Sequence, residues 1–304
     1  MGVWGTGLYS GDFAMDLRST IAALLRLPFD PERIVAIACE VEPSAASDPK
    51  DEEHTTFWLV LADQFAKRGV SSDRVRTKAL AILDSREDLT LMAKLGMNGT
   101  DLRRRETKLH ELRSRIVTAS SSGKPRNTLR SPQPLLMERG DVLVYPTCAG
   151  RCINPYFPSK EQDGRWTQDG WGAMTIIDCG RAFDFLAWYR ATTIAYAVAE
   201  RPTLDLLSGS EVLWRFGRPG TCSASHFRKM ELQKIGRFAV DQEKLKNVFP
   251  ILKPGISAAV QDISIANSMN AVPNVQSWAI PKPGEPSKGR APTTLGIRQI
   301  LQEL

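Results

Sequence analysis

Apolar positions in the first 117 residues recur every three or four residues, which is the spacing of one helical face. One such face runs from Phe13 to Leu24, directly after Asp12, a residue type that favours the N-cap position. The tripeptide Asp30-Pro31-Glu32 predicts a second helix start, because proline suits the first helical position and an acid is stabilised by the positive end of the helix dipole. The chain therefore opens with short amphipathic helices.

The same pattern predicts further helices up to residue 117. The apolar run 57–61 opens one helix that Gly69 is expected to end, and the pair Ser71-Ser72 is expected to cap the next. Ser85 and Asp88 have capping-box spacing before another helix. The final helix carries an apolar stripe made of Leu102, Leu109, Leu112 and Ile116. Six short helices in this order indicate a small all-α bundle.

Residues 118–139 differ in character and show no periodicity. They are rich in serine, proline and basic residues, from Thr118 through Lys124 to Pro134. Such a composition is typical of an exposed connection between domains. We therefore predict a linker over residues 118–139 that separates the helical bundle from a second domain.

Short apolar runs between glycine-containing turns follow the linker and predict strands. Gly140-Asp141-Val142 opens a β-branched run that ends near Tyr145. Further strands are expected at residues 171–177 and 183–193. The turns and the remaining candidate strand are at Gly170, Asp178-Cys179-Gly180 and residues 227–240. The region after the linker is therefore predicted to be mainly β.

Two segments of the second half are less regular. Residues 186–201 fit a strand or a helix, and we assign a strand to their first half. Residues 277–304 are rich in proline, glycine and lysine, which predicts an extended tail with a short helix from about Thr294.

The whole pattern predicts an α+β protein, with a helical domain over 1–117 and a mainly β domain over 140–276. The second domain is expected to be a strongly bent sheet or a small barrel.

The composition is that of an ordinary globular protein, and it places the positive charge in the second half. Hydrophobic residues make up 42% and charged residues 24% of the 304 residues. Residues 1–117 carry 17 basic and 18 acidic residues, so the formal net charge of +6 arises beyond them. Such an excess favours acidic partners, including nucleic acid.

The distribution of apolar residues and cysteines bears on the compartment. No apolar run approaches the roughly 20 residues of a membrane-spanning helix. The start, Met1 to Gly5, has neither the basic nor the apolar region of a signal peptide. Five scattered cysteines fit reduced thiols better than a disulfide framework. We therefore expect a cytoplasmic protein without membrane contact.

The glycine-rich start suggests a phosphate-binding loop, but its chemistry differs. Residues 2–11 contain no lysine, follow no strand and lack the phosphate-loop and dinucleotide-binding spacings. A structural role fits better, with a tight glycine turn and aromatic side chains folded onto the bundle. Asp12 and Asp16 lie one helical turn apart, as two metal ligands do, although first-turn acids also favour the helix dipole. The residues assigned this structural role are Trp4, Gly5, Gly7, Tyr9, Asp12 and Asp16.

Thiol and imidazole chemistry has few candidates. Cys148 and Cys152 have the spacing of half a metal site, but no second pair of ligands follows, so we interpret them as ordinary thiols. In the segment from Cys222 to His226, nucleophiles and a base are sequence neighbours, although catalytic triads are defined in space. We expect no metal, no cofactor and no catalysis, and keep a hydrolase near Cys222 and His226 as a third alternative.

Arginine and aromatic residues supply the candidate binding surfaces. The run Arg103-Arg104-Arg105 is interpreted as a solvated helix face that neighbouring glutamates partly neutralise. In the second half, aromatic and arginine residues alternate, which fits core packing, a protein-binding patch or a stacking surface for single-stranded nucleic acid. The candidate partner-binding residues are Arg165, Trp166, Trp171, Arg181, Trp188 and Arg190.

The N-terminal motif resembles a known pattern. Residues 2–16 resemble the opening of a bacterial domain family of unknown function, which reads G-x-W-G-x-G, an aromatic residue, then D-x-A-x-D. The likeness continues more weakly through residues 79–95 and covers about the first 117 residues. Gly11 departs from the family, whose members often carry asparagine there. The resemblance implies a bacterial protein.

A second resemblance concerns the start of the mainly β region. Gly140-Asp141-Val142 and the strands after it are similar to bacterial immunity proteins of toxin–antitoxin-like competition systems. This resemblance implies a protein that binds and blocks another protein, such as a toxin or defence effector. Our leading hypothesis is therefore a cytoplasmic bacterial interaction protein that occludes a partner. A nucleic-acid-binding protein that uses the basic second half is the alternative.

Overall fold

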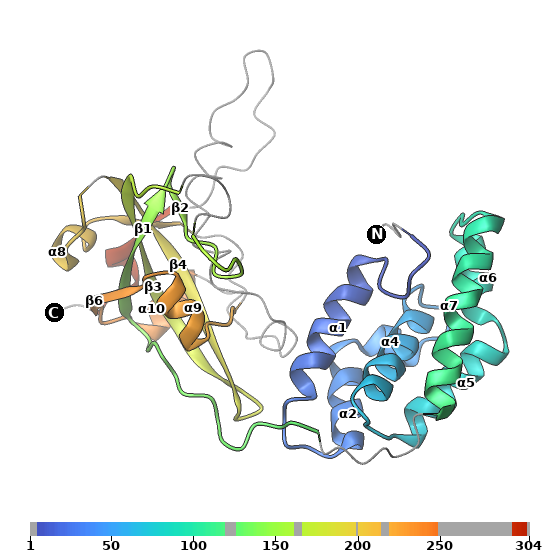
Figure 1. Ribbon diagram of the computed structural model, residues 1–304. Helices are drawn as coiled ribbons and strands as arrows, with labels where there is room; N and C mark the ends of the chain where they lie inside the picture. Colours follow the sequence, from blue (N-terminus) through green and yellow to red (C-terminus); the bar gives the residue numbers. More distant parts are fainter. Residues whose placement is uncertain are drawn as a thin grey trace. The chain divides into compact units, whose positions relative to one another are not determined.

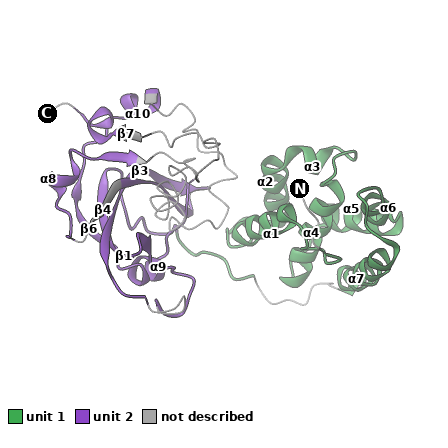
Figure 2. Cartoon of the chain, turned by 90° about the horizontal axis from the view of Figure 1, so that it is seen from above, with its two compact units in different colours: residues 1–131 green, residues 132–304 purple. Residues whose placement is uncertain are grey.

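The computed structural model describes residues 5–118, 126–160, 166–198, 200–213, 219–248 and 294–302. The chain divides between Ser131 and Pro132 into unit 1, residues 1–131, and unit 2, residues 132–304 (Figure 2). The described part of unit 1 is helical, whereas unit 2 contains a sheet with short helices (Figure 1). The fold class is α+β, as predicted.

Unit 1 is built around one buried helix. Its described helices are α1 (Asp12–Leu24), α2 (Pro31–Val41), α3 (Pro43–Ser47), α4 (His54–Lys67), α5 (Asp73–Asp84), α6 (Glu87–Lys94) and α7 (Gly99–Thr118) (Figure 1). Every residue of α4 from His54 to Phe65 is buried, and α4 contacts α1, α3, α5, α6 and α7. Because α4 is enclosed along most of its length, its sequence shows a continuous apolar run instead of one apolar stripe.

Several helix ends follow the predicted capping chemistry. The carboxylate of Asp30 accepts a hydrogen bond from the backbone N–H of Arg33 at 2.9 Å, so it caps α2. The hydroxyl of Ser72 accepts from the N–H of Val75 at 3.3 Å and caps α5. Gly69 follows α4 with a φ of 62°, a conformation that glycine adopts without strain.

Two predicted caps are wrong. Gly11 occupies the N-cap position of α1, and Asp12 is the first helical residue, so its carboxylate does not cap the helix. Ser85 and Asp88 do not form a capping box, because α6 begins after Arg86, which has a left-handed φ of 57°. Asp88 instead lies buried in an ion pair that sequence spacing does not show.

The segment predicted as an exposed linker contacts both units where it is described. The guanidinium of Arg126 donates to the carbonyl oxygens of Leu27 and Phe29 at 2.7 and 2.6 Å. The N–H of Gln133 donates to the carbonyl of Phe185 at 2.9 Å, and Met137 is fully buried in a core of unit 2. Residues 126–139 are therefore attached to their units by hydrogen bonds to backbone carbonyls and by burial, which their polar composition conceals.

Unit 2 contains a sheet in which all described neighbours are antiparallel. Its described strands are β1 (Asp141–Cys148), β2 (Arg151–Cys152), β3 (Gly170–Ala182), β4 (Leu186–Val198), β5 (Glu211–Leu213), β6 (Gln233–Arg237) and β7 (Thr294–Gly296). The order is β2-β1-β3-β4-β5-β7, and β6 also pairs with β1. Among the described residues no ladder closes the sheet, although Val240 and Leu301 form one isolated bridge. An open sheet, not a closed barrel, is the form that the described strands take.

Both faces of the sheet are covered. Leu143 and Tyr145 of β1 belong to one buried cluster, whereas Val142 and Val144 belong to another. Since side chains alternate between the faces of a strand, these clusters lie on opposite faces. The helices that accompany the sheet are α8 (Leu204–Leu207), α9 (Ala224–Lys229), α10 (Gln242–Val248) and the 3₁₀ helix η1 (Ile297–Ile300). Double coverage explains the uninterrupted apolar run of β1.

The central hairpin is longer than predicted. The predicted turn Asp178-Cys179-Gly180 lies inside β3, which accommodates it through a register shift between Ile176 and Asp178. The chain reverses at Phe183 and Asp184, both of which have left-handed φ angles. Residues 186–198 form one strand, so the strand assigned to the first half of that segment extends through nearly all of it.

The last predicted elements also differ from the structure. The candidate strand 227–240 is divided between the end of α9 and β6. The predicted terminal helix begins as the strand β7 and continues as η1. Residues 277–293 of the predicted extended tail lie outside the described residues. Short elements of three to five residues carry too few positions for periodicity to distinguish helix from strand.

Candidate functional site

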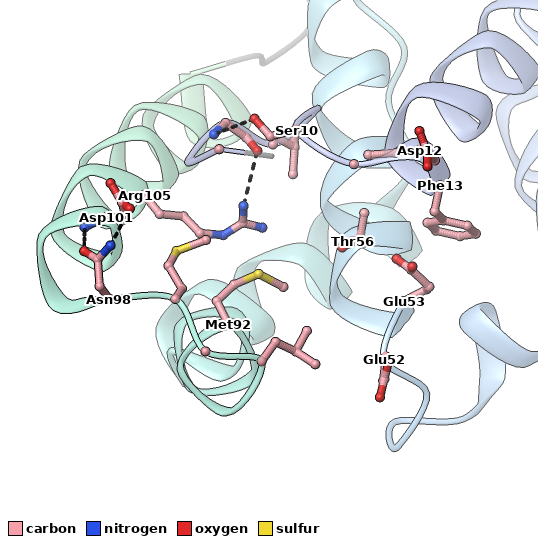
Figure 3. Close-up of a pocket in the computed structure, with 18 residues that line it drawn as sticks. Ser10, Asp12, Phe13, Glu52, Glu53, Thr56, Met92, Asn98, Asp101 and Arg105 are labelled. Atoms are coloured by element: carbon pink, nitrogen blue, oxygen red, sulfur yellow. Dashed lines mark hydrogen bonds between the residues drawn. The ribbon is translucent and has the colours of Figure 1, made fainter. Parts of the chain in front are cut away.

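A cavity of about 400 Å³ opens in unit 1, and we refer to it as the unit 1 cavity (Figure 3). Its walls come from the N-terminal segment, the starts of α1 and α4, and the segment that joins α6 to α7. Apolar lining is supplied by Phe13, Met92, Leu95 and Met97. Carboxylates are supplied by Asp12, Glu52, Glu53 and Asp101. The cavity thus combines an apolar wall with several acidic groups, which can fix the orientation of a bound group.

The N-terminal segment forms one wall through a tight turn. The N–H of Gly7 donates to the hydroxyl of Ser10 at 3.0 Å, and the N–H of Ser10 donates to the carbonyl of Gly7 at 3.1 Å. A Cβ atom at Gly7 would lie 2.9 Å from the Ser10 hydroxyl oxygen. Gly7 therefore allows the turn to close, in keeping with the structural role assigned to the glycine-rich motif. Trp4, another motif residue, lies outside the described residues.

Tyr9 attaches the same segment to α4. Its hydroxyl donates to the carboxylate of Asp63 and accepts from the side-chain amide of Gln64. Asp63 also accepts from Lys67 at 2.7 Å and from Arg115 at 2.9 Å. Burial alone would raise the pKa of Asp63, but the hydrogen bonds from Lys67 and Tyr9 outweigh it and hold that pKa below its usual value. One buried carboxylate thus joins the N-terminal segment, α4 and α7.

Acid is expected to destabilise unit 1 through Asp63. Because its pKa is lower in the folded chain, the stabilisation is complete above the unfolded value of about 3.9 and is lost as the pH falls through the folded value. Thermal unfolding followed by helical circular dichroism measures this effect. At pH 7 the unfolding midpoint of wild type should lie well above that of Asp63→Asn, and the difference between the two midpoints should disappear below about pH 4. Asp16→Asn, at an exposed acid of α1, serves as the control. A gap that stays constant down to pH 2 would contradict this role.

Arg105 closes the inner wall of the unit 1 cavity. It is 3% exposed, and its Nε and Nη2 donate to the two carboxylate oxygens of Asp88 at 2.6 and 2.8 Å. Its Nη1 donates to the carbonyl of Gly7 at 3.2 Å, which Figure 3 shows as a dashed line into the N-terminal turn. The prediction of a solvated arginine face holds for Arg103 and Arg104, which are exposed, but is wrong for Arg105.

The sequence contained a signal for this burial. Arg105 lies three residues after Leu102 and four before Leu109, so it falls on the same helical stripe as the leucines. Leu109, Leu112 and Ile116 of that stripe are buried in the structure. A charged residue inside an apolar stripe requires a buried counter-charge. Its identity, Asp88, follows from the packing of α6 on α7 and not from spacing.

The cavity carries an excess of negative charge. The charge of Arg105 is balanced by Asp88, which does not line the cavity. Asp101 accepts from the side-chain amide of Asn98 at 2.7 Å and lies 3.5 Å from the exposed guanidinium of Arg104. Glu53 has a raised pKa, caused by burial and by the neighbouring carboxylates Asp51 and Glu52. Burial by itself raises a carboxylate pKa, and the neighbouring carboxylates raise the pKa of Glu53 further.

The two acids singled out on α1, Asp12 and Asp16, lie in different surroundings. Both acids are exposed, but Asp12 lines the unit 1 cavity, whereas Asp16 is not among the lining residues. Asp16 contributes to the raised pKa of Glu42, after the larger effect of burial. Within the described residues, no group of three or more histidine, cysteine, aspartate or glutamate side chains is placed to hold a metal ion. The geometry of Asp12 therefore associates it with the cavity.

The candidate partner-binding residues do not form one exposed patch. Trp188 and Arg190 are buried within β4, at 8% and 2% exposure. Trp166 and Trp171 are half-buried beneath Lys160 and Arg201, respectively, with cation-to-ring distances of 5.2 and 5.6 Å. Arg181 is exposed and donates to the carbonyl of Gln133 at 2.7 Å, and Arg165 lies outside the described residues. The alternation seen in the sequence reflects core packing at Trp188 and Arg190.

The segment from Cys222 to His226 is occupied by structural contacts. Burial raises the pKa of Cys222 to about 12, so its thiol is protonated at neutral pH and is a poor nucleophile. The hydroxyl of Ser223 accepts from the backbone N–H of His226 at 3.1 Å, as the cap of α9. The ring of His226 packs edge-on against Tyr156 at 5.0 Å. Cys152, of the other candidate pair, also has its pKa raised to about 12 by burial.

Comparison of the chain with protein-family models, with curated proteins and with solved structures finds no match in any of the three. Across the described residues, no helix combines the length and apolar character needed to cross a bilayer. The geometry of the unit 1 cavity is therefore the main basis for assigning a function.

Proposed function

We propose that the chain is a cytoplasmic bacterial interaction protein, related to immunity or defence, that acts without a cofactor by occluding a surface of another protein. The proposal keeps the function implied by the N-terminal motif and by Gly140-Asp141-Val142. It assigns the contact to the unit 1 cavity instead of the aromatic and arginine residues of unit 2. The single observation that carries it is a concave site with acidic groups and an apolar wall.

The cavity suits a basic side chain of the partner protein. Four carboxylates are among its lining residues, and Arg105, the one basic residue in the described lining, is already paired with Asp88. Glu53 lies across the cavity from Arg105, beside Thr56 (Figure 3). A lysine or arginine side chain has an apolar stem for the Met92 wall and a cationic end for Asp12 and Glu53. Binding such a group relieves the repulsion among the acids.

Nucleic-acid binding receives less support from the described residues. Several basic side chains of unit 2 are already paired with acids. Lys160 lies 3.1 Å from Glu231, and Lys234 and Arg237 lie 2.7 and 2.9 Å from the carboxylate of Asp141. Paired charges contribute less to a field that attracts phosphates. We therefore keep nucleic-acid binding as an outcome of the test.

Affinity capture from a lysate of the native host, with and without nuclease, tests the proposal. The tagged chain is compared with a cavity variant, Asp12→Asn/Glu53→Gln, and with a control, Glu32→Gln/Asp73→Asn. The control removes the same charge from exposed first-turn acids of α2 and α5. One stoichiometric protein that survives nuclease and is lost in the cavity variant alone is expected. Capture of nucleic acid without a protein would contradict the proposal.

A further inference from the structure

Arg190 is a buried cation, and two of its guanidinium nitrogens lack a hydrogen-bond partner among the described residues. It is 2% exposed, and neither its Nε nor its Nη1 has an acceptor among the described residues. Leaving a buried charge unpaired costs several kcal/mol in general, so buried arginines are almost always held by an acid or by several acceptors. The position of Arg190 in a central strand therefore calls for a counter-charge.

Asp178, the acid opposite Arg190, does not serve as its hydrogen-bonded counter-charge. Asp178 lies opposite Arg190 in the β3–β4 register. Its Oδ1 accepts from Arg139 at 2.7 Å and from the N–H of Cys179 at 3.0 Å. One carboxylate therefore faces two guanidinium groups, those of Arg139 and Arg190. Within the part of the chain that the structure describes, this leaves one positive charge in excess beside Asp178.

A second orphaned group lies on the same face. Thr175 is fully buried, and its hydroxyl has no partner among the described residues. It lies opposite Thr192, which is two residues along β4 from Arg190. Residues two apart on a strand, and residues directly opposite across a ladder, share one face of the sheet. The two orphaned donors are thus diagonal neighbours on one face.

We propose that this face of β3 and β4 binds an oxyanion, a carboxylate or phosphate group, through the guanidinium of Arg190 and the hydroxyl of Thr175. The forked donors of arginine match the oxygens of either group, and a hydroxyl donates a further hydrogen bond. The oxyanion supplies the missing negative charge and satisfies both orphaned donors. This site is separate from the unit 1 cavity and does not depend on the proposed function.

Thermal unfolding of the full chain in inorganic phosphate, and separately in acetate, tests the site at constant ionic strength. Wild type should show a saturable rise in the midpoint of unit 2 with at least one anion, about 3–6 °C at ten times its dissociation constant. The anion that saturates at the lower concentration identifies the oxyanion. Arg190→Met should lose the response, whereas Arg151→Met, at an exposed arginine of β2, should keep it.

Thr175→Val provides a second variant that keeps the shape of the side chain. It should fold, and its apparent anion affinity should fall several-fold because one donor is lost. Two results would overturn the site: no saturable response in wild type to either anion, or equal responses in wild type and Thr175→Val. If Arg190→Met does not fold, the comparison of wild type with Thr175→Val decides the question.

Discussion

Gly140→Ala is expected to destabilise unit 2 by about 4 kcal/mol or more, among the largest effects of a single substitution. Gly140 has a φ of 84°, and an added Cβ would overlap the carbonyl oxygen of Phe238. The left-handed backbone alone costs an alanine about 1–2 kcal/mol. The clash adds more, because the obstructing atom is backbone and is held in place. Gly140 also accepts from the N–H of Phe238 at 2.8 Å, so a shift would disrupt the pairing of β1 with β6.

Hydrogen exchange read by mass spectrometry can locate this effect within unit 2. Peptides of β1, β3 and β6 should lose protection in Gly140→Ala, while the helices of unit 1 keep theirs. Gly209→Ala is the matched control in the same unit, because an added Cβ there meets nothing within 4 Å. Protection in Gly140→Ala equal to that in Gly209→Ala would show that β1 tolerates a side chain at this turn.

Asp88→Ala should cost unit 1 about 3–5 kcal/mol, because it leaves the guanidinium of Arg105 buried without its counter-charge. Urea unfolding followed by helical circular dichroism measures the change. The matched control is Asp84→Ala, which breaks an exposed pair with Arg113 at 2.9 Å. Exposed pairs contribute about 1 kcal/mol or less, so the control should shift the midpoint little.

The double variant Asp88→Met/Arg105→Met separates loss of the pair from exposure of an unpaired charge. Replacing both members of a buried ion pair with apolar residues is often close to neutral. We therefore expect the double variant to be much more stable than Asp88→Ala. Equal losses in Asp88→Ala and Asp84→Ala would mean that Arg105 finds another partner or reaches solvent.

Local chemistry explains which parts of the fold could be predicted from the sequence. The α2 cap at Asp30, the α5 cap at Ser72 and the end of α4 at Gly69 depend on a few neighbouring residues, and all three are confirmed. The sequence of residues 186–198 fits the apolar spacing of a helix as well as that of a strand. Pairing with β3 makes it a strand. Asp178-Cys179-Gly180 was predicted as a turn but lies in a bulged strand, because these residues pair with β4.

The candidate site depends on contacts between distant residues. Asp12 was singled out from the motif, but Glu53 and Arg105 join it because α1, α4 and α7 pack together. The position of Arg105 in a leucine stripe signalled burial, whereas no spacing identified Asp88 as its counter-charge or Glu53 as a residue of the cavity. Arg190 was a candidate partner-binding residue with core packing as one alternative, and the structure buries it, because alternation along a strand does not reveal that both faces of a sheet are covered.

The proposed function requires that the unit 1 cavity receives a basic group of a partner protein. Its most direct test is the equilibrium dissociation constant of the captured partner for wild type, Asp12→Asn/Glu53→Gln and Glu32→Gln/Asp73→Asn, measured by calorimetry. Loss of charge partners in a desolvated site should weaken binding to the cavity variant at least about tenfold, or about 1.4 kcal/mol. The control should bind within about twofold of wild type, because its exposed acids lie outside the contact. Equal affinity for wild type and the cavity variant would contradict the claim and place the contact elsewhere on the chain.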